Sequence, residues 1–533
     1  MTLKINNINL ELDEPLSDIK TKICKKLRIS KDSINSFKIL RESIDARKKD
    51  NIKFNYSVEV NLCDEKKVLS KIKDKDVFLE KDNNKEEFVF GKEKINVRPI
   101  VIGLGPAGLF AALSLAQNGY RPIVFERGQD VDSRTKTVQD FWNGISDLNP
   151  ESNVQFGEGG AGAFSDGKLT TRIKDKRCSY VLKELVKEGA PKEIIYEGNP
   201  HVGTDILKDV VKNIREKIKA LGGEVYFNSK LDNIYIKDGK IKEISINNNK
   251  IPCETLILAI GHSSRDTYEM LLSNSIFMEP KDFAIGVRIE HLRGFINESQ
   301  YGKFADHPRL KAASYNLAYQ SQELKRGIYS FCMCPGGVVV GAASEKNRLV
   351  TNGMSYHSRN DENSNSALVV TVSEKDFDGS TPIKGMEFQR KYEELAYNLG
   401  GGNYVAPVQL LGDFMHDRKS NRLGCVKPSY KPGYEFKELK ECLPQSVCFA
   451  LKEGIQKFDQ KIKGYGMDDA VLTGVETRTS APVKITRTRE LESISASGLY
   501  PTGEGAGFAG GIISAAVDGI KVAESIMKKY ARP

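Results

Sequence analysis

Apolar and polar positions in the first part of the chain follow the periods of short strands and helices. Residues 3–12 alternate with a period of two, and residues 16–27 carry apolar side chains at helical spacing. The pattern continues with extended segments at 37–40, 54–62 and 77–80 and a short helix at 68–72. It predicts a small α+β N-terminal domain over residues 1–95 with a βαββαβ order, ending in a linker at 81–94 rich in Lys, Glu and Asn.

A strand, a glycine-rich turn and a helix follow this linker. The apolar run at 99–102 leads into Gly103, and the helix extends to Asn118. A second strand at 122–125 ends at Glu126. This is a complete βαβ opening, which predicts a parallel sheet of the α/β class.

The chain after residue 200 alternates between helical and extended patterns. Helices are predicted at 205–221 and 512–530. Extended segments are predicted at 224–227, 231–237, 241–247, 255–260, 283–290, 337–342 and 367–372. Over residues 271–480 the strand-like runs are separated by loops rich in Asn, Ser and Gly.

The turn after the first strand of the βαβ unit has the pattern of a dinucleotide-binding site. Gly103 allows the tight turn, Gly105 lets a pyrophosphate approach the backbone, and Gly108 lets the helix pack closely on the strand. Glu126 lies 23 residues after Gly103 at a strand end, where its carboxylate can accept hydrogen bonds from both ribose hydroxyls. The combination predicts a dinucleotide whose pyrophosphate lies at the helix N-terminus.

Three further glycine-rich segments favour FAD over NAD. The glycines of residues 154–169 allow the backbone to pass near a flat ring. Residues 256–261 resemble the strand that ends beside flavin phosphates, and residues 499–516 resemble the C-terminal flavin segment. An NAD-binding domain would not return to glycine-rich elements in this order.

The chain therefore resembles the glutathione-reductase-like group of Rossmann flavoproteins. Within that group it is similar, from about Arg41 to the C-terminus, to the bacterial family known as FAD-dependent protein or NAD(FAD)-utilising dehydrogenase. The segments that carry the resemblance are SIDARKK at 43–49, GEGGAGAFSDGKL at 157–169, FCMCPGG at 331–337 and ETRTSAP at 476–482. The resemblance implies FAD binding and an inserted middle domain, and it implies no particular substrate.

We expect the FAD-binding residues to come from all of these glycine-rich segments. Glu504 stands where many such flavoproteins have Asp, and with Gly503 it is expected near the ribityl chain and the pyrophosphate. The turn at Gly510 and Gly511 is expected to begin the last helix beneath the pyrimidine end of the isoalloxazine, where helix N–H groups stabilise negative charge. The predicted FAD-binding residues are Gly103, Gly105, Pro106, Ala107, Gly108, Glu126, Arg127, Gly160, Ala161, Ser165, Lys168, Leu231, Ala259, Gly261, Gly503, Glu504, Gly510, Gly511 and Ile512.

These patterns together predict an α/β protein with a discontinuous Rossmann-type FAD domain. Its first part spans residues 96–270 and its C-terminal part residues 481–533, because the last flavin segment has to return to the first βαβ unit. Residues 271–480 are expected to form an inserted, β-rich substrate domain that faces the isoalloxazine.

Two cysteines in this middle segment are candidates for redox chemistry. Cys332 and Cys334 are two residues apart, so in a strand both sulfurs could point to one side. A thiolate beside oxidised flavin could form a charge-transfer pair or relay electrons to a disulfide. The spacing differs from the CxxC of flavin disulfide reductases, and the alternative is that both are small buried apolar side chains.

Arg478 and His357 are the other candidate catalytic residues. The planar guanidinium of Arg478 suits a carboxylate substrate or negative charge on the flavin, and the alternative is an ion pair with Glu476 or another carboxylate. His357 could act as an acid or base, and the alternative is a solvated loop histidine. His262 follows the strand that ends at Gly261, where it either contacts a cofactor phosphate or caps a turn.

Composition argues against several other classes of protein. The 533 residues are 39% hydrophobic, and no apolar run is long enough for a transmembrane helix. No apolar signal segment is visible, and the nine scattered cysteines match neither a disulfide framework nor a zinc site, so a cytoplasmic location is expected. Six histidines without an acidic cluster predict no metal, and no GxSxG elbow indicates a hydrolase.

The predicted function is an FAD-dependent oxidoreductase that transfers a hydride between flavin N5 and a small substrate. Because only one dinucleotide fingerprint is present, NAD(P)H would dock transiently as an electron donor, and a flavin monooxygenase is a variant of this class. An FAD-containing RNA-binding or RNA-modification factor and a structural flavin are the alternatives. The net charge is only +9, and residues 1–95 lack an interleaved aromatic and basic motif, so a nucleic-acid partner is not expected.

Overall fold

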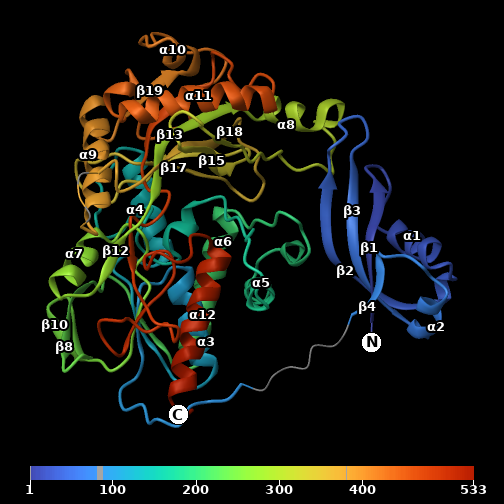
Figure 1. Ribbon diagram of the computed structural model, residues 1–533, viewed down its shortest axis with the longest axis horizontal. Coiled ribbons are helices and arrows are strands. Elements are labelled where there is room, and N and C mark those ends of the chain that lie inside the picture. Colours follow the sequence, from blue (N-terminus) through green and yellow to red (C-terminus); the bar gives the residue numbers. More distant parts are fainter. Residues whose placement is uncertain (1, 81–87, 378, 380) are drawn as a thin grey trace.

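The N-terminal unit is a four-stranded antiparallel sheet with a helix packed on it (Figure 1). The structure is a computed structural model that describes residues 2–80, 88–377, 379 and 381–533. Its first elements are β1 (Thr2–Glu11), α1 (Asp18–Leu27), a 3₁₀ turn (Lys31–Ser33), β2 (Ile34–Asp45), β3 (Lys53–Leu62), α2 (Glu65–Ser70) and β4 (Val77–Glu80). Their order is the βαββαβ order that the apolar pattern predicts. Of the linker predicted at 81–94, residues 81–87 lie outside the described residues.

The core of this unit follows from strand periodicity. The strands lie in the order β2-β3-β1-β4. In β3 every second side chain from Phe54 to Leu62 is buried, because successive side chains of a strand point to opposite faces. This apolar face packs with Ile19 and Ile23 of α1.

Hydrogen bonds from the backbone and from side chains dock the N-terminal unit on the rest of the chain. The N–H of Glu42 in β2 donates to the Tyr196 carbonyl oxygen over 2.7 Å, and the carbonyl of Glu42 accepts from the Gly198 N–H over 2.6 Å. In addition, the guanidinium of Arg309 donates to two carbonyl oxygens in the segment that follows β1. The N-terminal sheet therefore extends, through one edge strand, onto the larger part of the molecule.

A five-stranded parallel sheet joins the beginning and the end of the larger part. Its strands, in spatial order, are β23 (Leu499–Pro501), β11 (Leu256–Leu258), β5 (Ile100–Ile102), β6 (Ile123–Phe125) and β7 (Glu224–Tyr226). Helices α3 (Pro106–Gln117), α6 (Thr204–Ala220) and α12 (Ile512–Lys529) cover it. All neighbouring strands run parallel, so this unit has the Rossmann-like α/β fold that the sequence predicts.

Helices α3 and α12 lie side by side although they are far apart in sequence (Figure 1). A Cβ on Gly519 of α12 would lie 2.0 Å from the carbonyl oxygen of Ala107 in α3. Only glycine permits this approach, which brings the first turn of α3 close against the middle of α12.

The remaining elements of this part surround the parallel sheet. An antiparallel meander has the order β10-β9-β8. The elements are β8 (Leu231–Lys237), β9 (Lys240–Ile246), β10 (Asn249–Pro252), α4 (Val131–Trp142), α5 (Arg177–Lys187), α7 (Arg265–Ser273) and 3₁₀ turns at Gly160–Phe164 and Lys192–Ile195. No helix in the described ranges is long and apolar enough to cross a membrane.

The middle segment is built on a mixed seven-stranded sheet. In spatial order its strands are β14 (Ala318–Gln320), β15 (Gly327–Cys334), β18 (Asn363–Val372), β13 (Phe283–Leu292), β21 (Val471–Glu476), β19 (Ala406–Leu410) and β20 (Tyr434–Phe436). Two strand pairs join β12 (Met278–Pro280) to β22 (Val483–Ile485) and β16 (Val338–Gly341) to β17 (Thr351–Met354). The helical segments are α8 (Arg293–Tyr301), a 3₁₀ turn (Gly302–Phe304), α9 (Lys384–Leu399), α10 (Leu411–Met415), a 3₁₀ turn (Leu439–Glu441) and α11 (Gln445–Lys461).

Two long helices in this segment, α9 and α11, were not predicted by the sequence pattern. The buried face of α9 includes Gln389 and Glu393, which are polar, so apolar periodicity does not reveal it. The buried face of α11, by contrast, has apolar residues at helical spacing from Val447 to Phe458, and this signal was available. The middle segment is therefore a sheet with helical cover, as Figure 1 shows for α9, α10 and α11.

Candidate functional site

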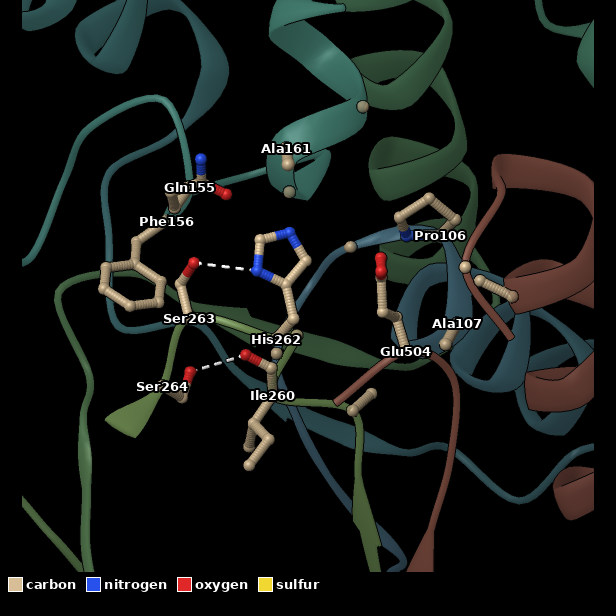
Figure 2. Close-up of a pocket in the computed structure, with 18 of the residues that line it drawn as sticks. Pro106, Ala107, Gln155, Phe156, Ala161, Ile260, His262, Ser263, Ser264 and Glu504 are labelled. Atoms are coloured by element: carbon tan, nitrogen blue, oxygen red, sulfur yellow. Dashed lines mark hydrogen bonds between the residues drawn. The ribbon is translucent and has the colours of Figure 1, made fainter. Parts of the chain in front are cut away.

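A cavity of about 360 Å³ opens where strands of the parallel sheet end. Ile102, Glu126, Ala259 and Thr502 line it, and each lies at or just after the carboxyl end of a strand. Open α/β sheets bind dinucleotides in crevices at this edge. We refer to it as the dinucleotide cavity, and Figure 2 shows part of its lining.

The turn between β5 and α3 forms the first wall of the dinucleotide cavity. Gly103 has a φ of +93°, and a Cβ there would lie 2.3 Å from the carbonyl oxygen of Ala259. A Cβ on Gly108 would lie 1.9 Å from the carbonyl oxygen of Gly103, so packing requires glycine at both positions. A Cβ on Gly105, by contrast, would meet nothing closer than the Cα of Gly160 at 3.7 Å. The space beside Gly105 is therefore open to a ligand.

Two helix N-termini meet this cavity. Gly105 is the N-cap of α3 and Gly511 is the N-cap of α12, and both line the cavity. The free N–H groups and the partial positive charge of a helix N-terminus attract anionic oxygens. The N-termini of α3 and α12 together fit a flavin dinucleotide, because its pyrophosphate and its reduced ring both carry negative charge.

The carboxylate of Glu126 is held at one end of the cavity by three backbone N–H groups. Leu104 donates to Oε2 over 2.7 Å, and Gly128 and Gly157 each donate to Oε1 over 3.0 Å. Oε2, which accepts only one of these bonds, keeps acceptor capacity for a ribose hydroxyl. This geometry fits the adenosine ribose of FAD. It indicates that the adenosine would lie at the Glu126 end of the cavity.

The opposite end of the dinucleotide cavity is built by the middle segment. Phe331 and Cys332 of β15, Asn352 of β17, Glu476 of β21 and the nearby Arg478 line it. An FAD with its adenosine at the other end would present its isoalloxazine to these side chains.

Nearly all of the predicted FAD-binding residues line this one cavity. They are Gly103, Gly105, Pro106, Ala107, Glu126, Arg127, Gly160, Ala161, Ser165, Lys168, Leu231, Ala259, Gly261, Glu504, Gly510, Gly511 and Ile512. Gly108 and Gly503 lie behind the lining, where a Cβ on Gly503 would come within 2.7 Å of the Cβ of Ala107.

Several lining residues were not predicted from the sequence. Gln155 and Phe156 belong to the glycine-rich loop at 154–169, which was the only signal for them. Ser263 and Thr267 carry no pattern that distinguishes them from other polar residues. In the described ranges, no three His, Cys, Asp or Glu side chains are grouped to hold a metal ion.

The four candidate catalytic residues do not all lie at the dinucleotide cavity. Cys332 and Arg478 line the dinucleotide cavity, and Cys334 is buried behind it. His357 does not line it. Its ring stacks on that of His201, with the centroids 5.1 Å apart.

Arg478 takes part in a buried ion pair. Its Nε and Nη2 donate to the two carboxylate oxygens of Glu393 over 3.1 and 3.0 Å. Arg265 donates to the same two oxygens over 2.7 and 2.9 Å. Glu476, the other partner considered for Arg478, is instead paired with Arg288. Arg478 therefore forms a structural ion pair, with Glu393 as its partner. The Arg478 side chain also lines the dinucleotide cavity.

Two titratable side chains that point into the cavity are neutral near pH 7. Burial raises the pKa of Glu504 to about 8, and the charge of Lys281 offsets this only in part. Burial lowers the pKa of His262 to about 3, and its Nδ1 lies 2.9 Å from the Ser263 hydroxyl. Figure 2 shows Glu504 beside Pro106. A protonated carboxyl group can donate a hydrogen bond.

A second cavity, of about 1000 Å³, shares lining residues with the dinucleotide cavity. The residues that border both cavities are Lys168, Thr170, Phe331 and Cys332. The charged side chains that line the second cavity are Lys168, Arg172 and Arg359, and no acidic residue of the described chain lines it. Arg359 is paired with Asp166, whereas Arg172 is exposed.

Comparisons with known proteins agree with this site. Residues 282–479 match the family FAD-dependent protein, C-terminal domain-like, and residues 2–61 match a domain of unknown function, DUF8436. An uncharacterized protein of Clostridium beijerinckii is 65% identical over 533 residues, which is 100% of both chains. This chain belongs to the same family as that protein. The match over the middle segment supports an FAD-dependent protein.

Solved structures have lower sequence identity to the chain than this relative. CtdE in complex with FAD is 12% identical, over 80% of this chain and 82% of its own, with a TM-score of 0.31. The glycine oxidase of Geobacillus kaustophilus is 9% identical, over 80% and 94%, with a TM-score of 0.35. A geranylgeranyl bacteriochlorophyll reductase-like protein of Thermoplasma acidophilum is 14% identical, over 80% and 76%, with a TM-score of 0.33. Likenesses this low assign neither substrate nor reaction to this chain.

Proposed function

We propose that this protein is an FAD-dependent oxidoreductase that holds FAD in the dinucleotide cavity and a small substrate in the second cavity. The observation that carries the proposal is the wall that the two cavities share, formed in part by Phe331 and Cys332. With the adenosine ribose at Glu126, the isoalloxazine reaches this wall. Bound FAD supplies hydride and electron-pair chemistry, which requires the substrate to lie against the ring.

The residues of the dinucleotide cavity would have separate tasks in holding FAD. Glu126 would accept the ribose hydroxyls, and the N–H groups after Gly105 would bind the pyrophosphate. The neutral Glu504 would donate a hydrogen bond to the ribityl chain or the ring. The first turn of α12, from Gly511, would stabilise negative charge on the ring.

The lining of the second cavity supports a small substrate that carries negative charge. Lys168, Arg172 and Arg359 are its charged residues. Because Asp166 compensates the charge of Arg359, an anion there would be attracted mainly by Lys168 and Arg172. Tyr315 and Tyr329 add aromatic surface. We therefore assign an anionic small molecule, rather than a nucleic acid, to this cavity.

A pyridine nucleotide is proposed as a transient electron donor, so that the reaction is that of a dehydrogenase or reductase. The chain has one dinucleotide fingerprint, at Gly103–Gly108, and FAD would occupy it. NAD(P)H would then have to dock from the second cavity.

The free thiols of all nine cysteines suit a cytoplasmic location.

The visible spectrum of the purified protein tests this function. We expect a flavin spectrum, release of FAD on denaturation, and anaerobic bleaching by NADPH or by NADH. A protein that neither contains nor takes up FAD would overturn the cofactor assignment. Bound FAD that neither nucleotide bleaches would remove NAD(P)H as the donor and leave the substrate or another protein in that role.

A further inference from the structure

The backbone at Cys332 departs from a regular strand. Cys332 has a φ of +43°, which non-glycine residues seldom adopt. The pairing of β15 with β18 also shifts there, because Phe331 pairs with Ala367 but Cys334 pairs with Asn365. The sequence Cys332–Cys334 is therefore a β-bulge, a feature that is frequent next to active sites.

This bulge matters because of the geometry that a disulfide needs. In a regular strand, residues two apart are separated by roughly 6.6 Å along the chain, whereas the Cβ atoms of a disulfide are about 4 Å apart. The bulge interrupts this regular spacing between Cys332 and Cys334. The Cys334 thiol donates to the carbonyl oxygen of Cys332, which lies 3.3 Å from its Sγ.

Two cationic side chains hold the bulge in place. Nη1 of Arg288 donates to the carbonyl oxygen of Cys332 over 2.8 Å, and Nζ of Lys168 donates to that of Met333. Arg288 is itself fixed by Glu476, which accepts from Nε over 2.8 Å and from Nη2 over 3.0 Å. A strained residue persists only where its surroundings over-determine it, and such residues cluster at functional sites.

The same surroundings give the two sulfurs different protonation. The hydrogen bond from Cys334, with the charges of Arg288 and Lys168, lowers the pKa of Cys332. Its hydrogen bond to Cys332 and its burial raise the pKa of Cys334 well above the ordinary value. One thiolate beside one thiol is the arrangement from which a disulfide forms.

Cys332 is also the cysteine that borders both cavities, whereas Cys334 is fully buried. The isoalloxazine of FAD would lie on one side of Cys332, and the second cavity is on the other. The sulfur that contacts the ring can thus also be reached by a substrate. Cys334 follows on the other side of the bulge and is the neighbouring thiol with which Cys332 could pair.

We propose that Cys332 and Cys334 form a redox-active dithiol that exchanges an electron pair with the FAD. The proposal rests on the proposed function, because the FAD is the electron acceptor. On oxidation, the Cys332 thiolate and the Cys334 thiol lose two electrons and one proton as the S–S bond forms, and they pass both electrons and the proton to FAD. The reverse step restores the thiolate and the thiol. A thiol or disulfide compound is then the class of substrate that the second cavity takes.

An anaerobic reductive titration of the full-length, FAD-loaded protein tests the dithiol. Exposed Cys63 and Cys425 are first replaced by Ser, so that they add no electrons. The protein is oxidised with glutathione disulfide, desalted and titrated with dithionite while flavin absorbance is followed. We expect four electrons per FAD, two for the disulfide and two for the flavin.

Cysteine variants in the same background identify the sulfurs. Cys332→Ser and Cys334→Ser are each expected to consume two electrons per FAD. Cys253→Ser, which changes a buried cysteine next to β11, is the matched control and should consume four. If the protein that retains Cys332 and Cys334 consumes only two electrons per FAD, while its FAD is bound and reducible, the dithiol proposal is overturned. The proposed function would then still stand. Absence of bound FAD would instead overturn the proposed function.

Peptide mass mapping gives a second readout that needs no variant to fold. After oxidation, the peptide that contains residues 331–337 should resist alkylation and be two mass units lighter than its reduced form. Full alkylation of both cysteines in oxidised protein would contradict the proposal whatever the titration shows.

Discussion

Gly105 and Gly160 approach each other so closely that a Cβ on Gly160 would lie 3.1 Å from the Cα of Gly105. Gly105 belongs to the turn after β5, and Gly160 begins a 3₁₀ turn of the glycine-rich loop with a φ of +59°. Two backbone segments without side chains thus touch each other in the wall of the dinucleotide cavity. A larger residue at Gly160 would push the two segments apart and change the shape of this wall.

Replacement of Gly105 by Val is expected to remove FAD while leaving the protein folded. A Cβ there has ordinary contacts with the protein, so the added methyl groups would mainly occupy ligand space. We expect the FAD content to fall by more than about tenfold, because the backbone could no longer approach the phosphates. Absorbance of the purified variant measures this.

The control for that variant is Gly294→Ala. Gly294 is exposed in α8, and a Cβ there would meet nothing within 4 Å. It should bind FAD like the wild-type protein. A yellow Gly105→Val protein with full FAD content would place the pyrophosphate elsewhere.

Replacement of Arg478 by Ala is expected to destabilise the protein. Its partner Glu393 is fully buried and would keep only Arg265 as a bidentate partner. Loss of one member of a buried ion pair should lower the free energy of unfolding by about 3 kcal/mol. Urea denaturation measures this.

An exposed ion pair serves as the control for the stability of the Arg478 variant. Lys384 pairs with Glu387 on the surface of α9, and Lys384→Ala should change the free energy of unfolding by less than about 0.5 kcal/mol. If Arg478→Ala kept wild-type stability but lost binding of an anionic substrate, the anion-recognition interpretation of Arg478 would be preferred.

The raised pKa of Glu504 predicts a pH dependence of stability in the FAD-free protein. Between its ordinary value of 4.5 and about 8, the folded protein keeps a proton on Glu504 that the unfolded chain releases. Stability should therefore fall as pH rises through this range. Glu504→Gln removes the titrating group, so the variant should gain about 1–3 kcal/mol relative to wild type between pH 5 and 8.

Denaturation curves at several pH values measure this difference. Glu387→Gln, an exposed carboxylate on α9, serves as the control and should follow the wild-type pH dependence. Parallel curves for wild type and Glu504→Gln would show that the carboxyl group is ionised in the folded protein.

Replacement of Arg309 by Ala is expected to weaken the docking of the N-terminal unit. Arg309 Nη1 donates to the carbonyl oxygens of Leu12 and Glu14 over 2.7 and 2.6 Å, and its guanidinium lies 4.5 Å from the centroid of the Phe54 ring. Loss of these contacts should lower the free energy of unfolding by about 1–2 kcal/mol without lowering the FAD content. Arg489→Ala, at an exposed arginine with no ion pair in the described chain, should change neither quantity. Loss of FAD from Arg309→Ala would show that the N-terminal unit supports the cofactor site directly.

Much of the dinucleotide cavity could be predicted from sequence because its geometry is local. The strand, turn and helix around Gly103 are contiguous, and the distance to Glu126 is set by one helix and one strand. Glycine is also informative at these positions, since Gly103 and Gly108 have no room for a Cβ. The alternation along β3 was equally clear, because a strand has only two faces.

What the sequence by itself determined was the βαββαβ order of the N-terminal unit and the strand, glycine-rich turn and helix that carry the dinucleotide fingerprint. Tertiary structure alone decided that Arg478 is paired with Glu393, 85 residues away, and that Arg288 of β13 holds the bulge at Cys332. It also decided that a second cavity meets the first at Cys332. The physical reason is that periodicity records which side chains are buried, whereas their partners depend on how distant segments pack.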